Sequence, residues 1–171
     1  MIKKALIAVV LIIIVLVAGF ICIGLVYPAV EYTTTVEINK PRDVTWQVMR
    51  ERKDWIYGFK SYEQLSGAPN EPGSKGRVTV VRDGREMSMD TELIDVKPPE
   101  SATTRFTSDG MVHNATVHLT ESNGKTTVVS NEKLEGTNII WRSIFAIFKS
   151  MIVDTSRKNF DGLKQAVESS Q

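Results

Sequence analysis

The sequence predicts an α+β domain in which an antiparallel sheet of about seven strands packs against a long C-terminal helix, with one transmembrane helix before it. Three observations carry this prediction. An uncharged apolar run lies near the N-terminus, alternating patterns with hairpin signals fill the middle, and apolar residues at helical spacing run to the C-terminus. Alternation is typical of half-buried strands, and a 3.6-residue period is typical of helices that cover a core.

The composition is that of one globular domain with a small addition. The chain has 171 residues, of which 42% are hydrophobic and 24% are charged, and domains commonly span about 100–200 residues. A formal net charge of +1 excludes a nucleic-acid binder that works by bulk electrostatics, because such proteins carry a strong basic excess. The single cysteine excludes an intrachain disulfide framework and a multi-cysteine metal site.

Residues 5–27 form an uncharged apolar run that predicts a transmembrane helix. At 1.5 Å per residue such a helix spans roughly 34 Å, enough for a hydrocarbon core of about 30 Å. Two lysines precede the run and the first charges after it are acidic, so the positive-inside tendency places residues 1–4 in the cytoplasm. We therefore expect a single-pass protein of the plasma (inner) membrane, with residues 31–171 on the periplasmic or extracellular side.

A cleaved signal peptide is the alternative interpretation of this run. The apolar region of a signal peptide is about 7–15 residues long and ends in a small-residue cleavage site. The run here is longer, and the residues around Pro28 make a poor cleavage site. The sequence therefore favours an uncleaved anchor.

The domain is expected to open with a strand and a helix. Apolar and polar residues alternate over residues 32–38, which predicts a strand with one buried face. Pro41 suits the first position of a helix, and apolar residues recur at helical spacing after it. The mixed charges from Arg50 to Asp54 are expected to form a solvated helix face, and the aromatic segment at residues 54–59 a short turn or second helix.

Only strand signals follow, as far as residue 134. Asp83-Gly84 and Asn123-Gly124 are two-residue hairpin signals, which join neighbouring strands antiparallel and leave no place for βαβ units. The expected strands cover residues 62–65, 77–82, 85–96, 103–108, 112–120 and 126–134.

A long helix is expected over residues 138–169, with Asn138 as its N-cap. Its second half carries a regular apolar stripe, but residues 139–153 are apolar nearly all round. A helix of that kind is deeply buried or faces something other than water, and this stretch is too short to cross a bilayer.

Four segments carry a resemblance to a known superfamily. They are Val36-Glu37-Ile38-Asn39-Lys40-Pro41-Arg42-Asp43-Val44-Thr45-Trp46, Trp55, Pro72-Gly73-Ser74-Lys75-Gly76 and Asp161-Gly162-Leu163-Lys164. In this order they resemble the START-like superfamily, also called SRPBCC, and within it the polyketide cyclase/dehydrase and lipid-transport group. The similarity covers about residues 31–167.

The resemblance implies the helix-grip fold, in which a strongly curved sheet wraps around the C-terminal helix. The sheet and helix of that fold enclose an apolar cavity for a lipid, sterol or polyketide-like ligand. No catalytic residues are carried over, because the superfamily has no shared catalytic set. The expected partners are therefore a lipid or other hydrophobic small molecule and the bilayer, with no nucleic acid.

The candidate ligand-binding residues are mostly apolar, as in most small-molecule sites. They are expected to face the space between sheet and helix or to lie near its mouth, and methionine adapts well to irregular shapes. A filled core of this size needs the same residues, so both interpretations stay open. The set comprises Trp46, Tyr57, Phe59, Met87, Met89, Phe106, Met111, His113, Phe145, Phe148 and Met151.

His113 is the candidate for acid-base chemistry. It shares strand parity with Ala115 and Val117 and so points to the cavity side, where a hydrogen-bonded core histidine is the alternative. His118 has the opposite parity, so the two histidines cannot bind one metal ion together. No metal-ligand spacing, dinucleotide fingerprint or P-loop occurs, so neither a metal nor another cofactor is expected.

Three functions fit these observations. The first is membrane-anchored binding or transport of a lipid or other hydrophobic small molecule. The second is a cyclase- or dehydrase-type enzyme on the same fold, with His113 as acid or base. The third is a non-catalytic interaction module with a filled core, which docks through the apolar helix segment that contains Phe145 and Phe148.

Overall fold

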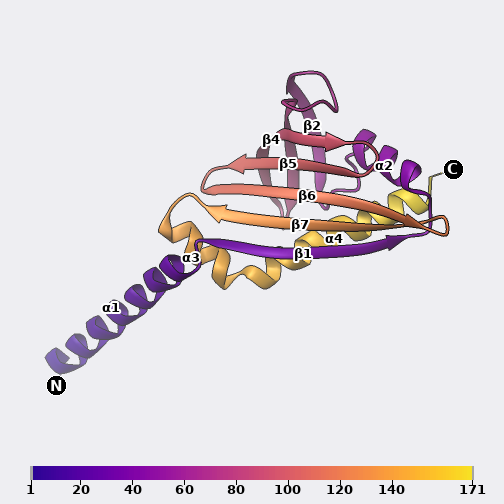
Figure 1. Ribbon diagram of the computed structural model, residues 1–171. Helices are drawn as coiled ribbons and strands as arrows, with labels where there is room; N and C mark the ends of the chain where they lie inside the picture. The colour runs from indigo at the N-terminus through magenta and orange to yellow at the C-terminus, as the bar shows by residue number, and fades with distance from the viewer. Residues whose placement is uncertain (1, 171) are drawn as a thin grey trace.

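The computed structural model describes residues 2–170, and Figure 1 shows the arrangement of its elements. These elements are α1 (Ile2–Val26), β1 (Ala29–Ile38), α2 (Arg42–Glu51), β2 (Phe59–Ser66), β3 (Lys75–Arg82), β4 (Arg85–Lys97), β5 (Ser101–Ser108), β6 (Met111–Ser122), β7 (Lys125–Gly136), α3 (Ile139–Ile147) and α4 (Lys149–Glu168). The expected α+β order is confirmed, and the aromatic segment before β2 is a turn rather than a helix.

One antiparallel sheet holds the strands in the order β1-β7-β6-β5-β4-β3-β2. Both expected hairpins are present, because Asp83-Gly84 and Asn123-Gly124 have positive φ at both residues, the geometry that suits right-twisted strand pairs. In Figure 1 the sheet bends so far that β2 stands at a steep angle to β1. The sheet is therefore strongly curved, as the helix-grip fold requires.

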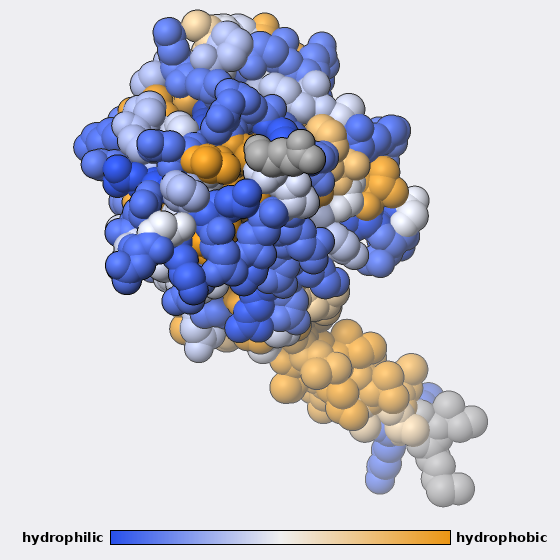
Figure 2. Space-filling view, turned by 90° about the vertical axis from the view of Figure 1, so that its right-hand side faces the viewer, coloured by the Kyte–Doolittle hydropathy of each residue, from blue (hydrophilic) through white to orange (hydrophobic). Residues whose placement is uncertain are grey.

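α1 is long and apolar enough to cross a membrane, and it projects from one end of the domain (Figure 1). Its candidate span, Lys3–Val26, has a mean hydropathy of 3.5. In Figure 2 the apolar surface gathers on this helix and at its junction with the domain, whereas the domain surface in the same view is mostly hydrophilic. The contrast marks α1 as the part of the chain least suited to water.

The C-terminal end of α1 packs closely against α3. Ser143, which is fully buried, donates a hydrogen bond to the Phe20 carbonyl. A Cβ on Gly24 would lie 2.4 Å from the Ile139 carbonyl oxygen, so the two helix backbones touch at this glycine. α1 is therefore attached to the domain by side-chain and backbone contacts as well as by the short link to β1.

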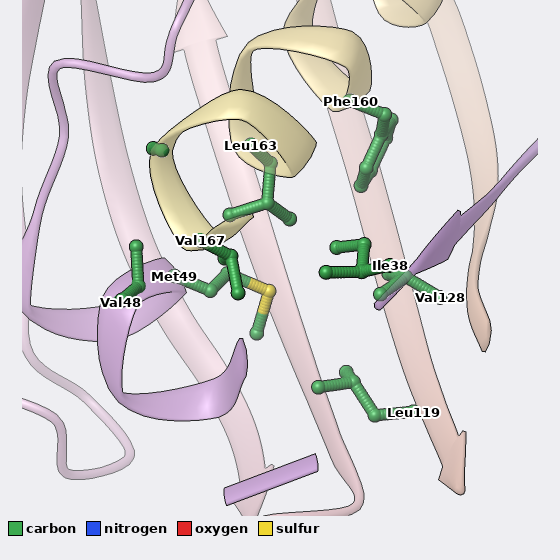
Figure 3. Close-up of a cluster of buried hydrophobic side chains, with 9 residues drawn as sticks. Ile38, Val48, Met49, Leu119, Val128, Phe160, Leu163 and Val167 are labelled. Carbon is green, nitrogen blue, oxygen red and sulfur yellow. The ribbon is translucent and has the colours of Figure 1, made fainter. Parts of the chain in front are cut away.

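The main core lies between α2, α4 and the β1–β7–β6 side of the sheet. Leu163 and Val167 of α4 are fully buried, as are Ile38 of β1 and Val128 of β7. Figure 3 shows these side chains pointing toward one another, with Met49 of α2 beside them. The apolar stripes of the two helices therefore cover this half of the sheet.

The C-terminal helix is broken, which corrects the expectation of one helix over residues 138–169. Asn138 does cap its start, since the side chain accepts hydrogen bonds from the Ile140 and Trp141 amides. Phe148 has φ −96° and ψ 20°, and α4 begins at the next residue. The break has a physical reason, because α3 packs against α1 whereas α4 packs against β1.

Candidate functional site

The concave face of the sheet is only partly filled. The main core occupies the space over β1, β7 and β6, but a cavity of about 430 Å³ remains over β3, β4 and β5. We call it the inner cavity. It is lined by Arg50, Glu51, Lys53, Ile56, Tyr62, Gln64, Pro69, Asn70, Ser74, Val78, Thr91, Leu93, Thr104 and Phe106.

Three neighbouring strands supply the apolar wall of the inner cavity. Val78 of β3 and Leu93 of β4 are buried, and Phe106 of β5 is half-buried. The register brings them together, because Thr91 lies opposite Gly76 on one side and Phe106 on the other. Strand alternation then places all these residues on the concave face.

The opposite side of the inner cavity is basic. Arg50 lies in the last turn of α2, Lys53 follows that helix, and both side chains are half-buried. Lys53 Nζ donates a hydrogen bond to the Arg50 carbonyl oxygen at 2.6 Å and lies 5.9 Å from the centre of the Tyr62 ring. Burial, reinforced by the Arg50 guanidinium, lowers the pKa of the Lys53 ammonium to about 8.

The expectation of a solvated face from Arg50 to Asp54 is wrong for two of these residues. Arg52 and Asp54 are exposed and form an ion pair at 2.6 Å, but Arg50 and Lys53 turn inward. The reason is the extended backbone of Arg52, with φ −101° and ψ 149°. In extended backbone successive side chains point to opposite sides, so Arg52 faces water and Lys53 faces the cavity.

Tyr62 depends on a glycine in the neighbouring strand. A Cβ on Gly76 would lie 2.2 Å from the Tyr62 hydroxyl oxygen, so this ring fits only because Gly76, which lies opposite Gln64, has no side chain. The Tyr62 hydroxyl donates to Gln64 Oε1 at 3.1 Å, and Gln64 Nε2 donates to the Ser74 hydroxyl at 2.9 Å. These bonds tie β2 to the loop before β3 at the edge of the inner cavity.

A second cavity of about 620 Å³ lies at the end of the same strands nearest α3. We call it the methionine cavity. Met89, which lines it, is two residues from Thr91 on β4, which lines the inner cavity. The two cavities therefore lie end to end along the sheet. The methionine cavity is lined by Arg77, Arg82, Met87, Ser88, Met89, Asp90, Thr107, Ser108, Asp109, Met111, Trp141 and Phe145.

Trp141 holds α3 against the sheet at the methionine cavity. Its ring stacks on Phe145 with the ring centres 5.6 Å apart. It also lies directly over Gly110 in the β5–β6 turn, where a Cβ would be 2.1 Å from the indole Nε1. Gly110 has φ +82°, so both the turn and this contact require glycine.

A buried carboxylate ties together the covered half of the concave face. Glu132 of β7 is 7% exposed, and it accepts hydrogen bonds from the Tyr32 hydroxyl at 2.9 Å and from the Ser156 hydroxyl of α4. His113 Nε2 of β6 lies 3.0 Å from Glu132 Oε2. Burial favours a raised pKa for the Glu132 carboxyl, but the contacts with His113, Ser156 and Tyr32 hold that pKa below its ordinary value.

His113 points to the concave face, as its strand parity predicts, but it lines neither cavity. Its ring lies between those of Phe106 and Tyr32, at centre distances of 5.6 Å and 6.4 Å. Its Nε2 is buried beside Glu132 and makes no aligned hydrogen bond within residues 2–170. The described part of the chain also holds no group of three His, Cys, Asp or Glu side chains placed to bind a metal ion.

Five other candidates from the sequence line a cavity. Phe106 lines the inner cavity, whereas Met87, Met89, Met111 and Phe145 come together in the methionine cavity. Sequence alternation predicted that the two β4 methionines face the concave side. In the structure they line a cavity there, at the α3 end of the strands.

The remaining candidates lie elsewhere. Trp46 packs against the main core, Phe59 is half-buried at the start of β2, and Tyr57 is exposed beneath Lys158. Phe148 and Met151 are 49% and 61% exposed, which corrects the expectation that they line the space between sheet and helix. The break between α3 and α4 turns them away from the sheet.

Several residues of the inner cavity were not among the candidates. Strand alternation could have identified Leu93 and Thr104, because they share the parity of Met89 and Phe106 and so face the same side of the sheet. Arg50 and Lys53 carried no such signal, because a cation at the end of a helix is usually solvated.

Comparison with solved structures shows which fold this is. Ara h 8.0201 superposes with a TM-score of 0.66 at 12% identity, over 83% of this chain and 99% of that one. Ginseng major latex-like protein 151 from Panax ginseng gives a TM-score of 0.65 at 13% identity, over 81% and 97%. The di-domain ARO/CYC StfQ from the steffimycin biosynthetic pathway gives 0.66 at 11% identity, over 82% and 51%.

No protein-family model and no curated protein sequence matches the chain. The structural matches nevertheless cover nearly all of the chain after α1 and share its single curved antiparallel sheet and C-terminal helices. The chain therefore has the helix-grip fold of the START-like, or SRPBCC, superfamily, with one apolar helix added before it.

Proposed function

We propose that this protein is a membrane-anchored binding protein for a lipid or other hydrophobic small molecule, which it holds in the inner cavity. The observation that carries the proposal is the open half of the concave face. Its volume of about 430 Å³ falls within the range of about 300–1,000 Å³ typical of ligand sites. Val78, Leu93 and Phe106 give it an apolar wall, and the polar and charged side chains that line the rest can orient a ligand.

The membrane anchor of this proposal is α1. We place residues 1–4 in the cytoplasm and the domain on the periplasmic or extracellular side of the inner membrane, in line with the two lysines before the span. α3 touches α1 from Phe20 onward, and the helix rises roughly 9 Å from there to its end at Val26. α3 therefore lies at the depth of the membrane interface.

The exposed apolar side chains around α3 support this placement. Ile140, Ile147, Phe148 and Met151 are 49–61% exposed, and such residues favour the boundary between headgroups and acyl chains. The methionine cavity lies beside α3, and the inner cavity is its neighbour along the strands. This order gives a hydrophobic ligand a route from the bilayer to the inner cavity.

The two alternative functions have less support. An enzyme that uses His113 as acid or base needs that nitrogen to reach a ligand, but Nε2 is buried beside Glu132 and His113 lines neither cavity. Two of the structural neighbours are ARO/CYC proteins of biosynthetic pathways, which keeps cyclase chemistry as the second candidate. An interaction module would have a filled core, but the space over the sheet is filled only in the half that α4 covers.

The test is native mass spectrometry of the full chain, released in the gas phase from nanodiscs made with membrane lipids. We expect a discrete hydrophobic adduct. Thr104→Phe places a ring in the inner cavity and should lower adduct occupancy about tenfold, equivalent to about 1.4 kcal/mol. Thr120→Phe, on the exposed face of β6, is the matched control and should retain the adduct.

Two results would contradict the proposal. One is a ligand-free mass for the wild-type chain that does not change when lipids and fatty acids are added. The other is an equal loss of adduct in both threonine variants with their fold intact by circular dichroism. The second result would mean that the adduct binds outside the inner cavity.

A further inference from the structure

We propose that the ligand of the inner cavity is an amphiphile with an anionic head, a carboxylate or a phosphate monoester, which pairs with Arg50 and Lys53. Its apolar chain lies along β3, β4 and β5. This inference rests on the proposed function and names the chemistry of its ligand.

The two cations have no counter-ion among the residues that the structure describes. Within residues 2–170 neither forms an ion pair, and Arg50 Nε is buried without a hydrogen-bond partner. Glu51 also lines the cavity, but it is exposed and its carboxylate accepts a hydrogen bond from Gln47 at 3.2 Å. Two half-buried like charges are unfavourable unless an anion compensates them. The ligand's head is the missing anion.

The shape of the site suits a molecule with a head and a chain. Arg50 and Lys53 lie at the α2 side, and the buried side chains of Val78 and Leu93 line the sheet side with Phe106. The methionine cavity begins at Met89, two residues from Thr91 on β4, so a longer chain can extend toward it. A guanidinium offers parallel donors to a carboxylate or phosphate, and an ammonium adds a compact charge.

The experiment compares three eight-carbon ligands by calorimetry with the full chain in phosphatidylcholine nanodiscs, with empty nanodiscs as the blank. The ligands are octanoate, octyl phosphate and octan-1-ol. We expect at least one of the two anions to bind about tenfold or more tightly than the alcohol, because only an anion pairs with the cations. The tighter anion identifies the source of the head, a fatty acid or a phosphate ester.

Substitutions then locate the head. Arg50→Met and Lys53→Met should each weaken the preferred anion about tenfold and leave octan-1-ol unchanged. Arg52→Met is the matched control, because Arg52 is an exposed cation of the same segment, paired with Asp54 outside the cavity. It should change neither ligand.

A pH series distinguishes a direct charge contact of Lys53 with the ligand from a purely structural role of Lys53. Lys53 loses its proton with a pKa of about 8, so binding of the anion should weaken as the pH rises from 7 to 9.5 while binding of octan-1-ol stays constant. The other titratable or charged groups of the cavity are Arg50, Glu51 and Tyr62. The Lys53→Met chain isolates Lys53 from them and should lose this weakening.

The outcomes separate this inference from the proposed function. If octan-1-ol binds as tightly as both anions, or if the cavity substitutions weaken all three ligands equally, the anionic head is wrong and the apolar site stands. If none of the three ligands binds to the wild-type chain, both proposals fail.

Discussion

Lys53 costs the folded protein stability at neutral pH. Its ammonium is half-buried beside a guanidinium, whereas in the unfolded chain it is surrounded by water. The folded pKa of about 8 lies below the ordinary value of 10.5. Between these two values the unfolded state binds more protons than the folded state, so the contribution of Lys53 to stability rises with pH in this window.

Lys53→Met should therefore raise the free energy of unfolding at pH 7, by about 1–3 kcal/mol. The difference from the wild-type chain should shrink as the pH rises from 8 to 10.5, because the folded-state lysine is then largely neutral and the unfolded-state lysine is losing its proton as well. Chemical denaturation at pH 7 and pH 10 measures both effects. Arg52→Met should stay within about 0.5 kcal/mol of wild type. A Lys53→Met chain that is less stable at pH 7 would contradict the assignment.

At this scale the sequence reveals strand residues better than residues that follow a helix. Alternation correctly placed His113 and Phe106 on the concave face, because a strand has one period and two faces. It said nothing of Lys53, whose direction depends on the backbone of Arg52. Sequence patterns do not identify the exact residue at which a helix ends. A shift of one residue there would turn a side chain from the cavity to the solvent.

Among the elements, α3 has the most unusual surroundings. It touches α1 through Ser143 and Gly24 on one side and the β5–β6 turn through Trp141 on another. The sequence showed that residues 139–153 are apolar nearly all round and that such a helix faces something other than water. It did not show the break at Phe148, because the apolar period continues through the break without a proline or glycine.

Gly24→Leu should separate α1 from α3. Its side chain would meet the Ile139 carbonyl and the Ser143 hydroxyl at 2.4 and 2.5 Å from the Cβ, and overpacking of this kind costs about 1–3 kcal/mol. Hydrogen exchange of the α3 amides in nanodiscs should become about tenfold faster or more. Gly19→Leu is the control, because among the described residues a Cβ there meets no atom within 4 Å outside its own stretch of α1. Equal exchange in both variants would contradict the contact between the two helices.

For the whole molecule, the proposed topology is testable with cysteines, since Cys22 is the only native one. In a Cys22→Ser background, Ser122→Cys lies on the exposed end of β6 and should react with a membrane-impermeant maleimide in right-side-out vesicles. Ile2→Cys should react only after detergent is added. Mass spectrometry of the labelled chains gives the result, and the reverse pattern would invert the proposed orientation.

The order of the elements was enough to predict the α+β class and the antiparallel neighbours, because hairpin signals dictate such neighbours and a helical period marks the C-terminal cover. The strong curvature of the sheet was implied only by the resemblance to the START-like superfamily. The sequence did not predict that the C-terminal helix covers only one half of the sheet. Whether α4 lies over the middle of the sheet or over β1 depends on contacts such as those of Ser156 with Glu132 and Thr34, which join residues far apart in the chain. The open half of the sheet follows from that position.

Only Tyr27 and Pro28 separate α1 from β1, and α3 clamps the same end of α1. A protein that carried its ligand across a wide aqueous gap would need a flexible linker of many residues, and no such linker is present between α1 and β1. With α1 in the proposed membrane, the domain has almost no reach. It can therefore exchange ligand only with the leaflet directly beneath it, or with a soluble carrier that comes to the membrane-bound domain.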